Sequence, residues 1–219
     1  MSSPSAPTDL QPSELARFEE VCRLGQDWRE QIATTVAQAF EDDPIWQWML
    51  NADRTLTLDE ALPFARGLVA RSSAADEIHG FRDHRAVALW SAPAEQVSEE
   101  VTAACEAQAE PFWVAVAEQM GDGLERLGAL GEVMRESHPD EPHWYLGIVG
   151  VRPGHQGEGL GTRVLAPMLE RCDRLGIATY LLSSNPRNHS LYHRLGYDDL
   201  GDITALDSPP LRRFLRGPK

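Results

Sequence analysis

Residues 149–162 read VGVRPGHQGEGLGT, and this stretch is the most informative part of the chain about its fold. It follows an apolar run at 144–151 and leads into residues 160–175, whose apolar positions recur with helical spacing. Glycines let a backbone turn tightly and approach a ligand closely. The free N–H groups of a helix start, together with the helix dipole, favour an anion. The stretch therefore predicts a strand, a phosphate-binding loop and a helix.

Two familiar phosphate-binding patterns do not fit this loop. The dinucleotide pattern G-x-G-x-x-G requires a glycine where Thr162 follows Gly157 and Gly159. The P-loop ends in Gly-Lys-Ser/Thr, whereas Gly161 is followed directly by Thr162. What remains is V-x-P-x-x-Q-G-x-G-x-G at residues 151–161.

A second motif lies downstream, where LLSSNPRN at 181–188 precedes LYHRLGY at 191–197. Gly196 fits the end of a short helix that carries Tyr192. In this order the two motifs resemble those of the GNAT acetyltransferase superfamily. Its loop pattern, Q/R-x-x-G-x-G/A, is filled by Gln156, Gly159 and Gly161.

Less specific matches extend the resemblance over nearly the whole chain, from about Val21 onward. Residues 39–44, 86–93 and 141–146 resemble the branch formed by puromycin N-acetyltransferases and their actinobacterial relatives. The resemblance implies an α/β (α+β) GNAT fold. This fold has a central mixed, mostly antiparallel twisted sheet of six to seven strands, flanked by helices, with a helical insertion between strands three and four.

The periodicity of apolar residues predicts the individual elements. Helices are expected at 27–40, 56–70, 94–120, 124–137 and 160–175, with a short one around Tyr192. Strands are expected at 18–24, 78–82, 86–90, 144–151, 177–183, 199–206 and 211–215, the last at an edge of the sheet. The helices at 94–120 and 124–137 form the insertion, where an acceptor pocket could be built.

Length and composition predict one domain at 14–219, after a disordered tail at 1–13. The resemblance implies that the acetyl-CoA-binding core of this domain lies at 143–200. The net charge of −14 argues against a nucleic-acid partner, because phosphate contacts need clustered cations. No apolar run reaches the length of a membrane span, and the start of the chain does not resemble a signal peptide. A cytoplasmic protein is therefore expected, as a monomer or homodimer. The three cysteines lack metal-ligand spacing, so no metal is expected.

By resemblance, acetyl-CoA is the donor. The backbone of Val149, Gly150 and Val151 is expected to pair with the pantetheine arm, and Asn188 and Tyr192 to lie beside it. The pyrophosphate is expected to bind the following loop and helix start: Gln156, Gly157, Glu158, Gly159, Leu160, Gly161 and Thr162. Arg152, Arg163 and Arg187 are candidates for contact with a phosphate of the same molecule.

Direct transfer to an amine needs an acid for the leaving thiolate and a base for the amine proton. Tyr192 occupies the family's acid position. For the base, His143 is the first candidate because imidazole titrates in the useful range. Asp43, Glu106, Glu110 or a chain of water molecules are alternatives.

The acceptor is expected to be a primary amine of a small molecule, with an antibiotic or aminonucleoside-like compound among the possibilities. Asp43 could pair with a cationic amine, while Trp46 and Trp90 could line an aromatic pocket. Residues 43–46 are expected to form a loop. Two alternatives remain open: acetylation of a protein or peptide, and a non-catalytic protein that binds acetyl-CoA.

Overall fold

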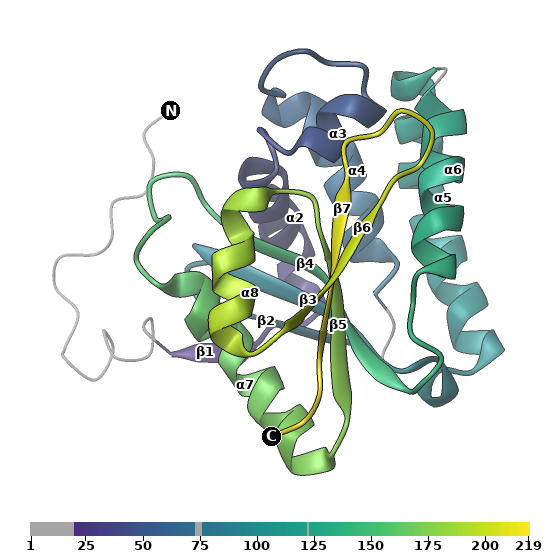
Figure 1. The fold of residues 1–219 in the computed structure, drawn as a ribbon. Helices are drawn as coiled ribbons and strands as arrows, with labels where there is room; N and C mark the ends of the chain where they lie inside the picture. Colours follow the sequence, from purple (N-terminus) through teal and green to yellow (C-terminus); the bar gives the residue numbers. More distant parts are fainter. Residues whose placement is uncertain (1–19, 73–75, 122) are drawn as a thin grey trace, which may run out of the picture.

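A computed structural model describes residues 20–72, 76–121 and 123–219. The expected tail at 1–13 lies outside these residues. Figure 1 shows a central twisted sheet with helices on both of its faces.

The sheet has seven strands among the described residues, in the order β1-β2-β3-β4-β5-β7-β6. Neighbouring strands are antiparallel, apart from the parallel pair β4 and β5. This confirms the predicted mixed, mostly antiparallel sheet. The strands are β1 Val21–Arg23, β2 Glu77–Phe81, β3 Ala86–Ser91, β4 His143–Val151, β5 Ala178–Ser183, β6 Asp198–Ile203 and β7 Leu211–Arg216.

The last strand, β7, does not lie at an edge as its position in the sequence suggested. It pairs with both β5 and β6, so that β6 forms the edge. The burial of the two strands explains this order. Phe214 of β7 is fully buried, whereas β6 carries the partly or fully exposed Asp198, Asp199 and Asp202. Charged side chains on an edge strand oppose pairing with another chain.

Seven α-helices cover the sheet in the described part of the chain. They are α2 Arg29–Ala39, α3 Pro44–Met49, α4 Leu58–Ala70, α5 Glu99–Met120, α6 Gly123–Glu136, α7 Leu160–Leu175 and α8 His189–Leu195. Short 3₁₀ helices lie at Gln26–Trp28, Ala94–Gln96 and Pro186–Asn188. The helices α5 and α6 form the expected insertion between β3 and β4. The segment expected as a loop at 43–46 is instead the start of α3.

The inner strand β3 is buried on both faces and divides the core in two. Val87 and Leu89 pack on the side of α2 to α6, while Ala86, Ala88 and Trp90 pack on the side of α7 and α8. Side chains alternate between faces along a strand. Trp90 is therefore a core residue of the α7 side, and it does not share a face with Leu89.

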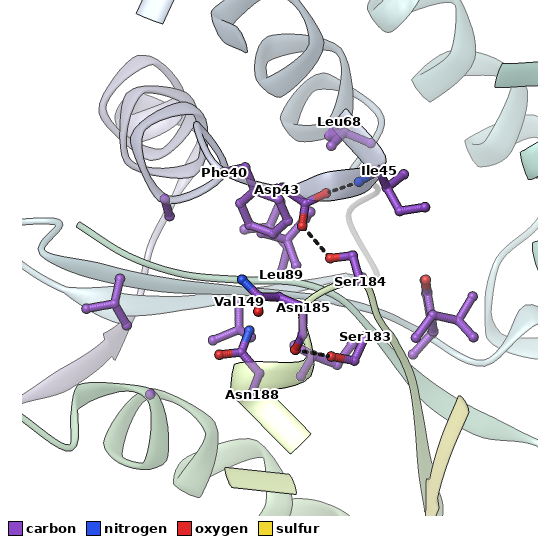
Figure 2. A pocket seen from close by; sticks show the side chains of 18 of the residues that line it. Phe40, Asp43, Ile45, Leu68, Leu89, Val149, Ser183, Ser184, Asn185 and Asn188 are labelled. Carbon is purple, nitrogen blue, oxygen red and sulfur yellow. Dashed lines mark hydrogen bonds between the residues drawn. The ribbon is translucent and has the colours of Figure 1, made fainter. Parts of the chain in front are cut away.

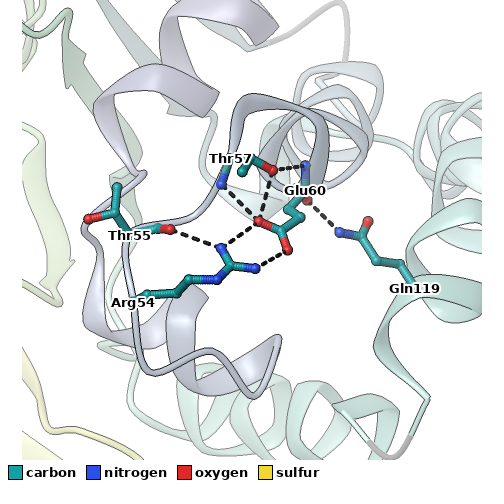
Figure 3. A network of polar contacts seen from close by, with 5 residues as sticks. All are labelled: Arg54, Thr55, Thr57, Glu60 and Gln119. Atoms are coloured by element: carbon teal, nitrogen blue, oxygen red, sulfur yellow. Dashed lines mark hydrogen bonds and ion pairs between the residues drawn. The ribbon is translucent and has the colours of Figure 1, made fainter.

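The start of α4 is held by a polar network that also reaches the insertion (Figure 3). Thr57 caps the helix: its hydroxyl accepts from the Glu60 N–H, and the Glu60 carboxylate accepts from the Thr57 N–H at 2.8 Å. Arg54 donates to both Glu60 carboxylate oxygens, at 2.7 and 3.0 Å. The Gln119 amide of α5 donates to the Glu60 carbonyl at 3.0 Å, which ties the insertion to α4.

These partners, Arg54 first, lower the pKa of Glu60 to about 2. When folding lowers the pKa of a carboxyl group, that group stabilises the folded state at pH values above its ordinary pKa. The stabilisation is lost as the pH falls through the lowered pKa. The cap is therefore intact at neutral pH and weakens only as the pH falls from about 4.5 toward 2.

Replacing Thr57 by Ala removes this cap, and we expect the free energy of unfolding to fall by about 1 kcal/mol. Urea denaturation at neutral pH measures the change. Thr34→Ala is the matched control, because Thr34 lies inside α2 and its hydroxyl only donates to the Glu30 carbonyl one turn back. Alanine has the higher helix propensity there, so the control is expected to keep or gain stability. Equal losses in the two variants would contradict the capping role.

Candidate active site

A large cavity, of about 1020 Å³, runs along the side of the sheet that faces α2 to α6. Its walls come from three parts of the chain that are far apart in sequence: the turn between α2 and α3, the end of β4 with the start of α7, and the end of β5 with α8. The insertion helices α5 and α6 contribute a fourth wall.

The loop between β4 and α7 turns through glycines that adopt left-handed conformations. Gly157 and Gly159 have φ of 83° and 76°, values that other residues rarely adopt, and a Cβ at either would meet open space. Gly159 directly precedes α7, and the Arg163 N–H makes the helix's first hydrogen bond, to the Gly159 carbonyl at 3.2 Å. The N–H groups of the residues before Arg163 therefore have no helical acceptor one turn back. This end of the 16-residue helix is suited to hold a phosphate group.

Most residues expected to bind the donor line the cavity. They are Val149, Val151, Gln156, Gly157, Gly159, Leu160, Gly161, Thr162, Asn188 and Tyr192. Gly150 and Glu158 are not among the lining residues. Gly150 instead faces α2, where an added Cβ would lie 3.0 Å from the Ala39 Cβ. Of the arginines expected near a phosphate, only Arg187 lines the cavity. Arg152 donates to the Thr35 hydroxyl at 3.0 Å, and Arg163 lies over the Phe81 ring at 4.8 Å.

The parallel strands β4 and β5 separate at the centre of the site. They pair from His143 with Ala178 as far as Leu146 with Leu181, and no pairing follows. At this point β4 has a bulge: Trp90 pairs with Leu146 and Leu89 with Ile148, so that Gly147 is the extra residue. A bulge bends its strand and increases its local twist. Beyond Gly147 the side of β4 that faces away from β3 is open to the cavity, so its backbone can pair with an extended ligand.

Tyr192, on α8, is almost fully buried but lines the cavity. Its ring packs against Phe214 at 5.3 Å and Tyr197 at 6.0 Å between centroids. Burial raises the pKa of its hydroxyl, and the charge of Asp43 acts in the same direction, while hydrogen bonding to Ser183 opposes them. The phenol therefore stays protonated at neutral pH, and it can donate a proton but not accept one.

Asp43 lies at the N-terminus of α3, where it caps the helix (Figure 2). One carboxylate oxygen accepts from the Ile45 and Trp46 N–H groups at 3.0 and 3.1 Å. The other accepts from the Ser184 hydroxyl, at the end of β5. Aspartate at the N-cap followed by proline is a strong helix-start signal, which is why residues 44–46 are helical.

The aromatic residues expected at the acceptor side divide between the cavity and the core. Trp46 lines the cavity together with Phe40 and Phe64, whose rings lie 4.9 and 4.7 Å from it. Trp90 does not line the cavity, because the alternation of β3 directs it to the opposite face of the sheet. Tyr145 of β4 does line the cavity. It could have been predicted as a lining residue only with knowledge of the bulge at Gly147, which changes the alternation of side chains along β4.

His143 lies at the start of β4 and is not among the residues that line the cavity. One of its ring nitrogens is 2.9 Å from a ring nitrogen of His138, and the other is 2.8 Å from the Glu141 carbonyl oxygen. Burial, together with the neighbouring His143, lowers the pKa of His138 to about 4. The structure thus pairs His143 with the loop that follows α6 and does not bring it to the site.

We expect His143→Ala to leave the pH dependence of turnover unchanged, because this imidazole does not line the cavity. Turnover measured across the accessible pH range would test this. Loss of one ionisation from the profile of the variant would return His143 to the list of candidate bases.

Comparison with known proteins agrees with this geometry. The Acetyltransferase (GNAT) family matches residues 77–197, more than half of the chain. The chain belongs to the GNAT acetyltransferase family. An uncharacterized N-acetyltransferase of Schizosaccharomyces pombe is 24% identical over 184 residues, covering 75% of this chain and 68% of that protein.

Solved GNAT structures share the fold. A Corynebacterium glutamicum protein described as histone acetyltransferase HPA2 and related acetyltransferase superposes with a TM-score of 0.63 at 22% identity, covering 91% of this chain and 96% of that one. Arylalkylamine N-acetyltransferase 2 of Aedes aegypti gives a TM-score of 0.56 at 11% identity, covering 91% and 99%. At these identities the likeness concerns the fold alone.

Within residues 20–72, 76–121 and 123–219, no group of three or more His, Cys, Asp or Glu side chains is arranged to hold a metal ion. None of the helices described there is long and apolar enough to cross a membrane.

Proposed function

We propose that this GNAT enzyme transfers an acetyl group from acetyl-CoA to the primary amine of a small molecule. The observation that carries the proposal is the large cavity that joins the start of α7 to the walls of the insertion. A ligand bound at the helix start and one bound beside α5 can meet in it without crossing any element of the fold.

The donor side of the cavity fits acetyl-CoA, the donor of this family. The N–H groups at the start of α7 suit its pyrophosphate, and the open side of β4 after Gly147 suits the amide groups of its pantetheine arm. When bound, acetyl-CoA supplies an activated acyl group to the amine. Tyr192 would then hold a proton at the point where the sulfur leaves, and an N–H of β4, such as that of Val149, would polarise the carbonyl.

The acceptor side combines apolar walls with one buried carboxylate. Phe40, Trp46 and Phe64 form an aromatic wall, and Asp43 lies at its edge. A carboxylate beside aromatic rings attracts an ammonium group by charge and by cation–π contact. The acidic chain, with a net charge of −14, would also concentrate cationic molecules near it.

A small acceptor is favoured over a protein because the insertion closes part of the cavity. Thr102, Cys105 and Glu106 of α5 line it, as do Leu130 and Met134 of α6. A peptide would need an open groove at this place. An antibiotic or aminonucleoside-like amine belongs to the favoured class, and a cytoplasmic location would place the enzyme where acetyl-CoA is made.

Acetylation of a protein or peptide is the second candidate, favoured by the likeness to the Corynebacterium glutamicum protein, which is named for histones. The Aedes aegypti neighbour is named for arylalkylamines, which are small primary amines. A peptide acceptor would need an open groove beside the insertion, whereas a small amine would not. One experiment separates the two candidates.

The test is release of free CoA thiol from acetyl-CoA in the presence of amines. The panel contains aminonucleosides, aminoglycosides, arylalkylamines, polyamines, amino acids and short peptides with free N-termini or lysines. The proposal expects turnover with at least one small amine and little with peptides. Turnover confined to peptides would establish the second candidate, and CoA binding without any turnover would overturn both.

A further inference from the structure

The carboxylate of Asp43 is buried at a point where two distant parts of the chain meet. Asp43 is only 6% exposed, yet it borders the cavity. It caps α3 with one oxygen and accepts from the Ser184 hydroxyl with the other (Figure 2). A buried carboxylate normally has its oxygens satisfied in this way. Each oxygen of a carboxylate has two lone pairs, so the oxygen bound to Ser184 can accept one further donor.

Ser184 holds this second oxygen at the end of β5, beside the cavity. It directly follows β5, at the end where β5 has separated from β4. The pKa of the Tyr192 hydroxyl is raised, first by burial; the side chain of the preceding residue, Ser183, acts to lower it and the charge of Asp43 to raise it, so both groups lie near that hydroxyl. Asp43 and Tyr192 therefore border the same part of the cavity, Asp43 next to Ser184 and Tyr192 next to Ser183.

The other titratable groups at the cavity are less suited to accept a proton there. Asp42 is exposed and accepts from the Thr55 hydroxyl at 2.5 Å, while Glu106 is paired with Arg71 at 2.7 Å. Glu41 is only partly buried and is not hydrogen-bonded to Ser184. The full set that borders the cavity besides Asp43 is Glu41, Asp42, Arg71, Asp76, Cys105, Glu106, Tyr145, His155, Arg187, Tyr192 and Arg194.

We propose that Asp43 accepts the proton that the acceptor's ammonium group loses before attack, and that Ser184 positions its carboxylate for this step. The proposal rests on the proposed function and deepens it. The ammonium gives one proton to Asp43, and the neutral nitrogen then forms a bond with the acetyl carbon while the carbon–sulfur bond breaks. The sulfur takes the proton of Tyr192, the second nitrogen proton restores Tyr192, and Asp43 returns its proton to water.

The electrostatics of the site support this role. Burial raises the pKa of Asp43 above its ordinary value, while the hydrogen bonds from Ser184, Trp46 and Ile45 act in the opposite direction. A carboxyl with a raised pKa is a stronger base when ionised, and proton transfer from an ammonium costs less. Because the carboxylate must be ionised to accept a proton, turnover rises with pH through the pKa of Asp43.

Asp43→Asn is the variant that tests the proposal. Asparagine caps helices as well as aspartate does, so its side-chain carbonyl can still accept from the Ile45 and Trp46 N–H groups. We expect kcat to fall by about a hundredfold with an amine that is protonated at neutral pH, and the acid limb of the pH–rate profile to disappear. Glu41→Gln and Asp42→Asn make the same chemical change in the turn between α2 and α3. Both variants are expected to keep the wild-type kcat and the acid limb of the profile.

A second measurement separates proton transfer from simple binding of the ammonium. With an acceptor of low basicity, such as 2,2,2-trifluoroethylamine, the nitrogen is already uncharged at neutral pH. We expect Asp43→Asn to lower kcat for this acceptor by less than tenfold. An equal loss with both acceptors would overturn the role in proton transfer.

Ser184 is tested by two substitutions. Ser184→Ala removes the hydroxyl that donates to Asp43, so the pKa of the carboxyl rises. We expect the acid limb of the profile to move to higher pH and kcat to fall by about tenfold, with the Michaelis constant for acetyl-CoA unchanged. Ser184→Thr keeps a hydroxyl and is expected to restore both. A Ser184→Ala profile that does not move would overturn the positioning role.

The outcomes also distinguish this proposal from the proposed function. If the wild-type enzyme acetylates no amine, the proposed function fails first. If it acetylates amines and Asp43→Asn keeps its acid limb while Glu41→Gln loses it, the proposed function stands and the proton acceptor is Glu41.

Discussion

Replacing Tyr192 by Phe is expected to lower kcat by about a hundredfold while leaving the Michaelis constant for acetyl-CoA nearly unchanged. The substitution removes only the hydroxyl, and the ring keeps its packing against Phe214. General acid catalysis contributes about 10² to 10⁴ to a rate, and the expected loss lies at the lower end of this range. Steady-state kinetics with a saturating amine measures it.

The pH dependence gives this prediction a second readout. Because burial raises the pKa of the Tyr192 hydroxyl above its usual value, the phenol does not ionise around neutral pH. The loss in Tyr192→Phe is therefore expected to be uniform over this range, and the shape of the profile should not change. Asp43→Asn, in contrast, is expected to change the shape.

Tyr197→Phe is the matched control. Tyr197 is as buried as Tyr192, its pKa is raised for the same reason, and its ring lies 6.0 Å from that of Tyr192. It does not line the cavity, so kcat is expected to stay within about twofold of the wild-type value. If Tyr192→Phe keeps near wild-type turnover while binding acetyl-CoA normally, Tyr192 is not the acid.

Replacing Gly159 by Ala is expected to raise the Michaelis constant for acetyl-CoA by about tenfold or more. Gly159 has a φ of 76° directly before α7, and a left-handed conformation costs a residue with a Cβ about 1 to 2 kcal/mol. The backbone can relieve this strain by turning, which moves the N–H groups at the helix start. A loss of about 1.4 kcal/mol in binding corresponds to a tenfold change.

Gly176→Ala controls for strain alone. Gly176 ends the same helix with a φ of 68°, and a Cβ there would also meet open space. Both variants are expected to lower the free energy of unfolding by about 1 kcal/mol, and only Gly159→Ala should weaken acetyl-CoA binding. Calorimetric titration with CoA and urea denaturation measure the two effects. Equal affinity for CoA in both variants would contradict the role of the loop.

The elements that the sequence predicted well are those with local signals. The helix α7 was predicted at its observed bounds in spite of Pro167, because its apolar positions repeat with helical spacing and Gly176 ends it. The insertion of α5 and α6 was also predicted, since long helix-compatible runs without strand signals favour helices.

The features that the sequence did not reveal depend on contacts between distant residues. Trp90 is a typical residue for an aromatic pocket, but the register of β3 in the sheet decides which face it occupies. The order of β5, β7 and β6 depends on which strands pair, and a strand's own sequence does not specify its neighbours. Asp43 and Ser184 form a hydrogen bond across 141 positions of sequence, so neither side chain alone indicates the pair.

Local signals in the sequence predict the proposed donor end of this protein. The glycine loop, α7 and Tyr192 lie within one contiguous stretch, and glycine positions and helix periodicity are properties of neighbouring residues. The proposed acceptor end, in contrast, depends on long-range packing. Its walls come from the turn before α3, the bulge of β4, the end of β5 and the insertion. These segments meet because the two faces of one sheet must be covered, and that packing sets which side chains border the cavity.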